Sequence, residues 1–265
     1  MFADYHVHTT LSGDSTQTID SICADALKLG IKEICLTEHQ DFLPGDFYYN
    51  RYSFEKVCQI AEYAEKEYPG IIVKKGVEID YQTQFLPEIF DFCMSYDFDY
   101  IIGSVHKINN RVVEGKEYYG NRSEDEIYTE YFRKIREMIC TNMFNCVGHI
   151  DFIKRGATPF FGRFDAQRYK DVICDALKEI IKRDMCLEIN TNGFHRPALN
   201  DFYPDVKILE WYRELGGENI NFGSDSHEIH HLGTKINEMY DFIEKLGFDK
   251  ITTYSKRIKK YVPVR

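Results

Sequence analysis

The chain has 265 residues, of which 43% are hydrophobic, and a formal net charge of -10. This composition supports a sizeable buried core and excludes a largely disordered chain. The acidic balance argues against general binding to nucleic acids or anionic membranes, and no apolar run is long enough to span a bilayer. With no visible signal peptide and no C-x-x-C pair among its eight cysteines, we expect a cytoplasmic protein with free thiols.

Short apolar runs alternate with longer amphipathic runs along the chain. Apolar runs with little polar alternation predict buried strands at Phe2–His6, Glu33–Thr37, Ile71–Glu78, Tyr100–Ser104, Asn145–His149, Cys186–Asn190 and Asn219–Ser224. Apolar residues at three- and four-residue steps predict helices at Ile19–Leu29, Phe54–Glu67, Glu124–Ile139, Ala166–Lys182, Asp205–Leu215 and Ile229–Leu246, with a weaker helix at Pro87–Tyr96.

Seven strand–helix units in succession predict an α/β fold with a parallel sheet that is covered on both sides. No linker rich in Pro, Gly or Ser interrupts the series. A single domain with one closed or nearly closed barrel therefore fits better than two domains. An open doubly wound sheet is the alternative, and hydrophobic periodicity does not separate it from the barrel.

Candidate metal ligands gather at the carboxyl ends of the predicted strands, where parallel barrels place their active sites. They are His6, His8, His39, Glu78, His106, His149, Asp225 and His227, and the loop after His8 adds Asp14. Six of the nine histidines belong to this set, which surface histidines would rarely do. Imidazoles suit zinc, iron or manganese, and carboxylates can bridge two ions. One tetrahedral ion cannot use so many ligands, so the pattern predicts two or three divalent metal ions.

Two arginines fall in predicted strand-to-helix loops next to these ligands. Arg155 follows His149, and Arg196 follows the sixth predicted strand. The planar guanidinium group binds phosphate through two hydrogen bonds, so both arginines are candidates for substrate binding, and His195 shares the loop of Arg196.

The order His-x-His, Glu-His, Glu, His, Gly-His, Asp-x-His resembles the polymerase-and-histidinol-phosphatase (PHP) family over nearly the whole chain. The short form with His6-Val-His8-Thr9, Gly103-Ser104-Val105-His106 and Gly148-His149-Ile150-Asp151 is similar to PHP-type histidinol-phosphatases. The resemblance implies one phosphoesterase domain over residues 1–265 with a distorted seven-stranded (β/α) barrel. It also implies hydrolysis of a small-molecule phosphomonoester, L-histidinol phosphate, in histidine biosynthesis, with no nucleic acid as the expected partner.

The resemblance further implies a trinuclear site. One ion would be held by His6, His8, Glu78 and Asp225, a second by Glu78, His106 and His149, and a third by Asp14, His39 and His227. Glu78 would act as the bridge between two ions, and Asp225 would assist proton transfer to the leaving alcohol.

Two other functions remain open at this point. A nucleotide phosphatase or a 3′–5′ exonuclease would use the same ligands, although the sequence has no basic stripe for a long nucleic-acid track. A non-catalytic metal-binding module would need closed coordination with no position for water. The sequence fixes neither the metal nor the oligomeric state.

Overall fold

A computed structural model describes residues 1–264 of the chain. Seven strands form one parallel sheet in the order β1-β2-β4-β5-β8-β9-β10, and the two-residue strand β3 also pairs with β4. Their bounds are β1 Phe2–Val7, β2 Ile31–Leu36, β3 His39–Gln40, β4 Ile72–Asp80, β5 Tyr100–Ser104, β8 Cys146–Val147, β9 Cys186–Asn190 and β10 Ile220–Gly223.

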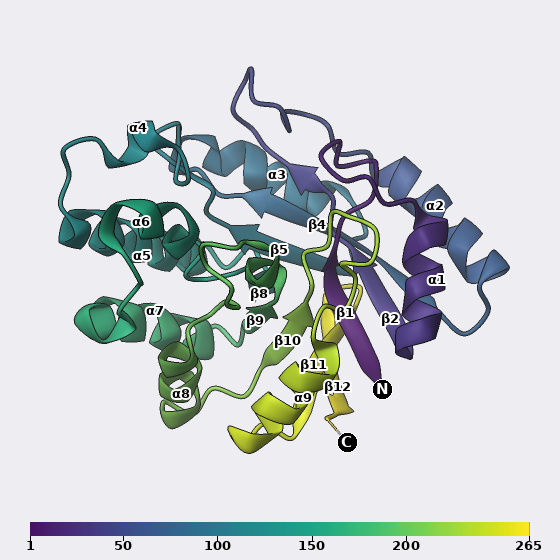
Figure 1. Ribbon diagram of the computed structural model, residues 1–265. Helices are drawn as coiled ribbons and strands as arrows, with labels where there is room; N and C mark the ends of the chain where they lie inside the picture. The colour runs from purple at the N-terminus through teal and green to yellow at the C-terminus, as the bar shows by residue number, and fades with distance from the viewer. Residues whose placement is uncertain (265) are drawn as a thin grey trace.

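The two ends of this sheet meet at their carboxyl ends. The backbone N–H of Asp225 donates to the carbonyl of His6 at 2.7 Å, and that of His8 donates to the carbonyl of Ser226 at 3.1 Å. Val7 and Ser226 also form a parallel bridge. Figure 1 shows β1 beside both β2 and β10. The predicted single α/β domain with a nearly closed barrel is therefore confirmed, and the open doubly wound sheet is excluded.

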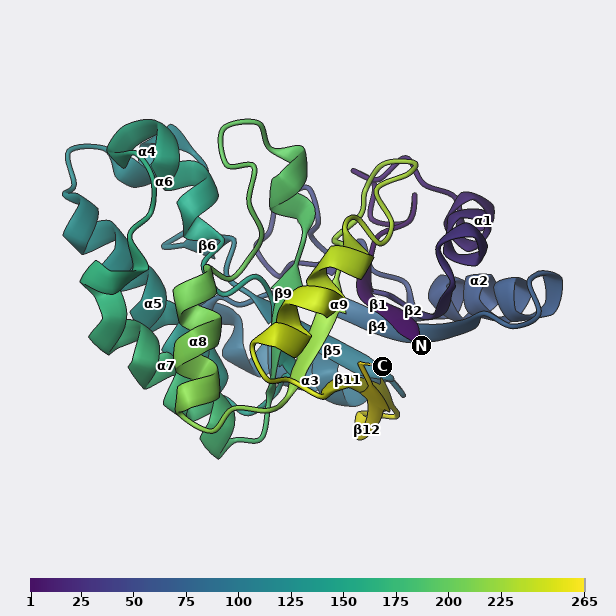
Figure 2. The same ribbon diagram turned by 60° about the horizontal axis from the view of Figure 1, so that its bottom comes forward.

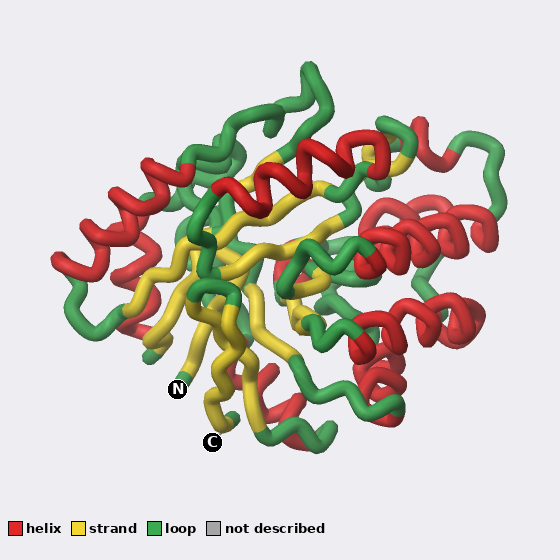
Figure 3. The backbone as a smooth tube through the Cα atoms, turned by 180° about the vertical axis from the view of Figure 1, so that it is seen from behind, coloured by secondary structure: helices red, strands yellow, loops and turns green. Residues whose placement is uncertain are grey.

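Amphipathic helices flank the strands on the outside (Figures 1 and 3). Their bounds are α1 Ile19–Leu29, α2 Phe54–Glu67, α3 Leu86–Ser95, α4 Lys116–Tyr119, α5 Glu124–Cys140, α6 Ile153–Phe161, α7 Lys170–Lys182, α8 Val206–Glu214 and α9 Ile236–Lys245. Local signals set several ends: Thr18 and Ser21 form a capping box at the start of α1, and Gly30 ends it with φ 73°. Among the described residues, we find no helix that combines the length and the apolar character needed to cross a membrane.

A C-terminal hairpin, which the sequence analysis did not predict, closes the amino-terminal end of the barrel. It consists of β11 (Lys250–Ser255) and β12 (Ile258–Pro263), and Figure 2 shows it beside β10 and the N-terminus. Tyr254 packs against Tyr100 and Tyr5, with ring centroids 5.0 and 6.2 Å apart. Its backbone N–H donates to Tyr5 Oη at 2.7 Å. This aromatic cluster fixes the barrel at the end opposite the candidate ligands.

The helix expected at Ile229–Leu246 begins only at Ile236, so the first part of that prediction was wrong. His230, Gly233 and Lys235 adopt positive φ angles of 70°, 60° and 54°, which a helix does not allow. The Gly233 N–H donates to buried Asp4 Oδ2 at 3.0 Å, so this segment is held as a loop over the end of the sheet. The short strands β6 (Lys107–Ile108) and β7 (Arg111–Val112) were also not predicted.

Candidate metal centre and active site

A cavity of about 430 Å³ opens among the loops at the carboxyl ends of the strands. Seven of the nine predicted metal ligands line it: Asp14, His39, Glu78, His106, His149, Asp225 and His227. His6 lies in β1 and His8 directly follows the strand, and both are fully buried behind this lining. The fold therefore brings all nine predicted ligands together.

Glu78, at the end of β4, lies at the centre of this group. Its Oε2 is 3.2 Å from His6 Nε2, 3.6 Å from His8 Nε2 and 3.0 Å from His39 Nδ1. Its Oε1 is 3.0 Å from His149 Nε2 and 3.4 Å from His106 Nε2. Five imidazoles from four segments thus converge on one buried carboxylate.

Asp225 completes the deeper part of the cluster. Its Oδ1 is 3.7 Å from His6 Nε2 and 3.6 Å from His8 Nε2. Both nitrogens are buried and have no hydrogen-bond partner. A buried polar atom without a partner is costly unless something else satisfies it. Two unpartnered imidazole nitrogens that face two carboxylates fit a divalent cation.

Asp14, His39 and His227 form the shallower part. Asp14 Oδ2 is 3.2 Å from His227 Nε2 and 3.7 Å from His39 Nε2, and the two imidazole nitrogens are 3.5 Å apart. Tyr48 Oη donates to Asp14 at 2.9 Å.

Across the whole cluster, ligand atoms that could share one ion occur in three sets: His8, His39 and His227; His6, His8 and Asp225; and His6, Glu78 and His149. How the ligands divide among ions stays a prediction.

Two members of the cluster, Glu78 and His8, have pKa shifts that favour their metal-binding forms. Burial alone would raise the pKa of Glu78, but His6, His106 and His39 outweigh it and hold that pKa well below its usual value. Burial, together with His227 and His39, lowers the pKa of His8 well below its usual value. Glu78 is therefore ionised and His8 neutral, which are the protonation states that metal ligands require.

Two buried carboxylates support this cluster and were not singled out from the sequence. Glu38 accepts from the Thr9 N–H at 3.1 Å and from Ser12 Oγ at 2.5 Å, and Ser12 Oγ also lies 2.9 Å from His8 Nδ1. Glu38 thus ties the loop after β1 to the end of β2. The second carboxylate is Glu188 of β9, whose Oε1 is 2.6 Å from His6 Nδ1. The fold, and not a local sequence motif, brings Glu38 and Glu188 close to the predicted metal ligands.

Lys107 lines the cavity but is held by three carboxylates. Its Nζ lies 2.5 Å from Asp41 Oδ2, 3.1 Å from Asp46 Oδ2 and 3.3 Å from Asp80 Oδ2. Burial would lower its pKa, but Asp80 and Asp41 outweigh burial and raise it, so Lys107 stays charged. Its three carboxylate partners make it an anchor for the loop after β3.

The two predicted phosphate-binding arginines both line the cavity. Arg155 Nε is 2.5 Å from Glu114 Oε1, and its guanidinium carbon lies 5.4 Å from the centroid of the Phe152 ring. His195 is not among the lining residues. Its ring stacks on His231 with centroids 3.5 Å apart, and its Nε2 lies 2.8 Å from Thr234 Oγ1. The substrate-binding roles of these residues remain predictions, and the geometry supports the arginines more than His195.

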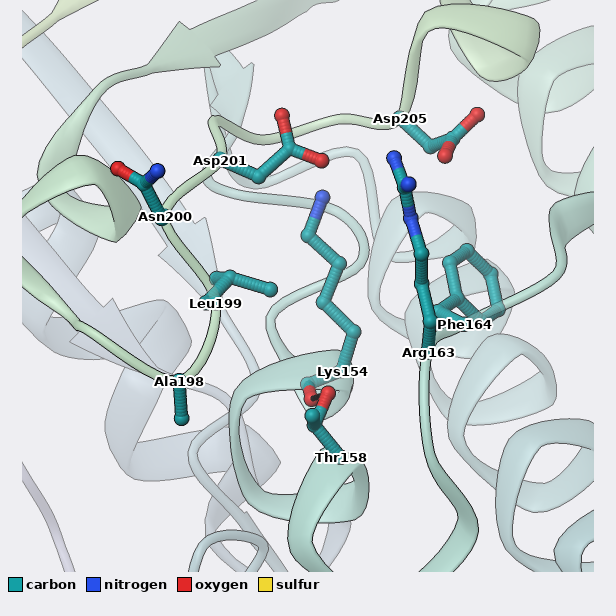
Figure 4. A pocket seen from close by; sticks show the side chains of 9 residues that line it. All are labelled: Lys154, Thr158, Arg163, Phe164, Ala198, Leu199, Asn200, Asp201 and Asp205. Carbon is teal, nitrogen blue, oxygen red and sulfur yellow. Dashed lines mark hydrogen bonds between the residues drawn. The ribbon is translucent and has the colours of Figure 1, made fainter.

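A second cavity, of about 300 Å³, lies beside α6 and contains none of the predicted metal ligands (Figure 4). Lys154 projects into it between the loop that carries Asp201 and the side chain of Arg163. The Lys154 Nζ lies 2.9 Å from Asp151 Oδ2 and donates to the Phe202 carbonyl at 2.6 Å. Because Lys154 directly precedes Arg155, this pair anchors the helix that presents Arg155 to the first cavity.

The chain is also similar to known proteins over most of its length. A family model described as the PHP domain matches residues 4–192. A histidinol-phosphatase of Lactococcus lactis is 31% identical over 95% of this chain and 94% of its own length. A probable histidinol-phosphatase of Thermotoga maritima is 26% identical over 96% and 97%. The solved histidinol phosphate phosphatase of Lactococcus lactis, complexed with zinc, L-histidinol and phosphate, has a TM-score of 0.88 and 29% identity, and the match covers 98% of each chain.

Proposed function

The chain belongs to the PHP domain family, and from this premise we propose that it hydrolyses L-histidinol phosphate to L-histidinol and phosphate in a metal-dependent reaction. The observation that carries the proposal is the environment of Glu78. This one buried carboxylate faces five imidazoles at 3.0 to 3.6 Å, in a cavity that two arginines also line. We extend the proposal to the whole chain, residues 1–265, as one phosphoesterase domain.

We propose that two or three divalent ions bind this centre. The deeper ligands are His6, His8, Glu78, His106, His149 and Asp225, and the shallower ones are Asp14, His39 and His227. Zinc is the first choice because the Lactococcus lactis structure contains it, and the same ligands suit iron or manganese. Such ions supply charge neutralisation for a phosphate group and a water that loses a proton near neutral pH.

The residues of the chain then bind and orient the phosphomonoester. Arg155 and Arg196 bind phosphate oxygens through paired N–H groups, which holds phosphorus in line for attack by water. The ester P–O bond breaks as the water oxygen bonds to phosphorus. Asp225, at the wall of the cavity, moves a proton from the attacking water to the oxygen of the leaving alcohol.

The cavity suits a small substrate whose organic half is cationic. Its volume of about 430 Å³ lies within the usual range for small-molecule sites. Carboxylates and aromatic rings line it beyond the metal ligands, namely Asp46, Glu114, Glu228, Phe47, Tyr48 and Phe152. Ammonium and imidazolium groups are attracted to such surfaces. A free small molecule rather than a nucleic acid is therefore the proposed partner, and a cytoplasmic location stays part of the proposal.

The direct test is phosphate release from L-histidinol phosphate by the purified protein, with the bound metal measured on the same sample. We expect turnover that a strong chelator abolishes and that added zinc restores. If a fully metal-loaded sample releases phosphate from no small phosphomonoester and cleaves no oligonucleotide, the protein is a non-catalytic metal-binding module. Cleavage of oligonucleotides alone would identify an exonuclease.

A further inference from the structure

Glu188 is a buried charge in the wall of the barrel. It lies in the middle of β9 and is 1% exposed, and β9 supplies none of the predicted metal ligands. Burying a carboxylate is unfavourable unless hydrogen bonds or opposite charges satisfy it. Its position therefore requires a set of partners that the fold provides.

Both oxygens of Glu188 have such partners. Oε1 lies 2.6 Å from His6 Nδ1. Oε2 accepts from the backbone N–H of His149 at 2.7 Å and from Asn190 Nδ2 at 3.2 Å. Asn190 Nδ2 in turn lies 3.2 Å from Asp225 Oδ2. Glu188 thus contacts one predicted ligand directly, the backbone of a second, and a third through Asn190.

The neighbouring strand leaves room for this carboxylate. A Cβ atom at Gly223 of β10 would lie 2.2 Å from Glu188 Oε1 and 2.6 Å from His6 Cβ, which is closer than atoms can approach. Glycine at position 223 therefore allows Glu188 and His6 to meet beneath the cavity.

We propose that Glu188 is a positioning residue that orients His6 toward the metal ions, an inference that rests on the proposed function. Because His6 Nδ1 donates to Glu188, the lone pair of the ring is on Nε2, which lies 3.2 Å from Glu78 Oε2 and 3.7 Å from Asp225 Oδ1. Hydrogen-bonded carboxylates behind metal-binding imidazoles fix both ring orientation and tautomer, and their loss typically weakens metal binding by about 10- to 100-fold.

The substitution Glu188→Gln tests this role with little change of shape. The amide oxygen can still accept from His6, but the amide NH₂ then faces the N–H of His149 and the amide of Asn190, and both of these contacts are lost; in the flipped orientation the contact with His6 is lost instead. We expect zinc affinity, measured by competition with a chromogenic chelator, to fall by about 10- to 100-fold. Glu33→Gln is the matched control, because Glu33 is also buried and accepts from Tyr5 Oη away from the cavity.

The outcomes separate this inference from the proposed function. Glu188→Gln with a native circular dichroism spectrum and wild-type zinc affinity would overturn the positioning role. If that variant does not fold, Glu188→Asp takes its place, because the shorter carboxylate keeps the charge but withdraws from His6. The same loss of affinity is expected there, and wild-type affinity would again overturn the role. A wild-type chain that binds no zinc would instead contradict the proposed function.

Discussion

At the scale of single residues, Glu78 is the one on which the centre depends most. Its buried carboxylate is the shared neighbour of five imidazoles. A neutral amide of the same shape would bridge two cations poorly. We predict that Glu78→Gln keeps the fold, lowers the metal content and reduces turnover by more than about 100-fold, since ligand loss exceeds the effect of a supporting residue. Elemental analysis and steady-state kinetics on one sample measure both effects.

The Glu33→Gln variant serves as the control here too, and it should keep metal content and turnover. Near-native turnover of Glu78→Gln with full metal occupancy would show that Glu78 is not the bridge.

Arg155 and Arg196 carry the second prediction at this scale. Replacing either one by Ala removes charge-assisted hydrogen bonds to phosphate. The transition-state stabilisation calculated from kcat/KM should therefore fall by about 1.5–3 kcal/mol for every phosphomonoester. Arg168→Ala is the control, because Arg168 pairs with Glu124 and Asp125 and does not line the cavity. A loss confined to one substrate would show that the arginine contacts the organic half instead of the phosphate.

Strand ends could be read from the sequence, but contacts across the barrel could not. The candidate ligands were found because the carboxyl ends of parallel strands share one edge, so residues far apart in sequence converge without any knowledge of the contacts. Glu188 was missed because its partner His6 is 182 positions away and nothing local distinguishes Glu188 from a strand residue. His195 was paired with Arg196 by adjacency alone, yet it turns toward His231.

At the scale of elements, a buried ion pair joins Lys154 of α6 to Asp151, which lies just before the helix. Lys154 and Asp151 are 2% and 0% exposed, and the Asp205 N–H also donates to Asp151 at 2.8 Å. We predict that Lys154→Met lowers the free energy of unfolding by about 3–5 kcal/mol, because it leaves Asp151 buried and unpaired. Adding Asp151→Asn should recover part of that loss. Chemical denaturation measures both changes.

The exposed pair of Lys178 and Asp175 in α7 provides the matched comparison. Its atoms are 3.3 Å apart and both side chains are more than half exposed, so Lys178→Met should change stability by about 1 kcal/mol or less. Equal effects of the two lysine substitutions would mean that burial does not set the strength of the α6 pair.

The elements themselves were predictable where their signals are local. The seven parallel strands and most helices follow from apolar spacing, and Thr18 and Gly30 even mark the ends of α1. Helix α6 was missed because Gly156 and Pro159 both disfavour a helix locally, and packing overrides them. The β11–β12 hairpin was missed because β12 is largely exposed and becomes a strand only by pairing with β11.

At the scale of the whole molecule, the metals should contribute to the stability of the fold, because the ligands come from most of the strands of the barrel. We predict more than one divalent ion per chain by elemental analysis. We also predict that zinc raises the melting temperature, since ligand at 100 times its Kd adds about 2.7 kcal/mol to the native state. One ion or none in a fully active sample would contradict the multi-ion centre.

The identity of the substrate is tested by ranking kcat/KM across a panel of phosphomonoesters. L-Histidinol phosphate, nucleoside monophosphates and a simple aryl phosphate all present the same phosphate group, so any preference must come from the organic half. Binding energy there orients phosphorus for attack, so a substrate without that half loses kcat as well as affinity. We predict the highest kcat/KM for L-histidinol phosphate. Equal values across the panel, or a preference for nucleotides, would mean that L-histidinol phosphate is not the substrate for which the cavity is built.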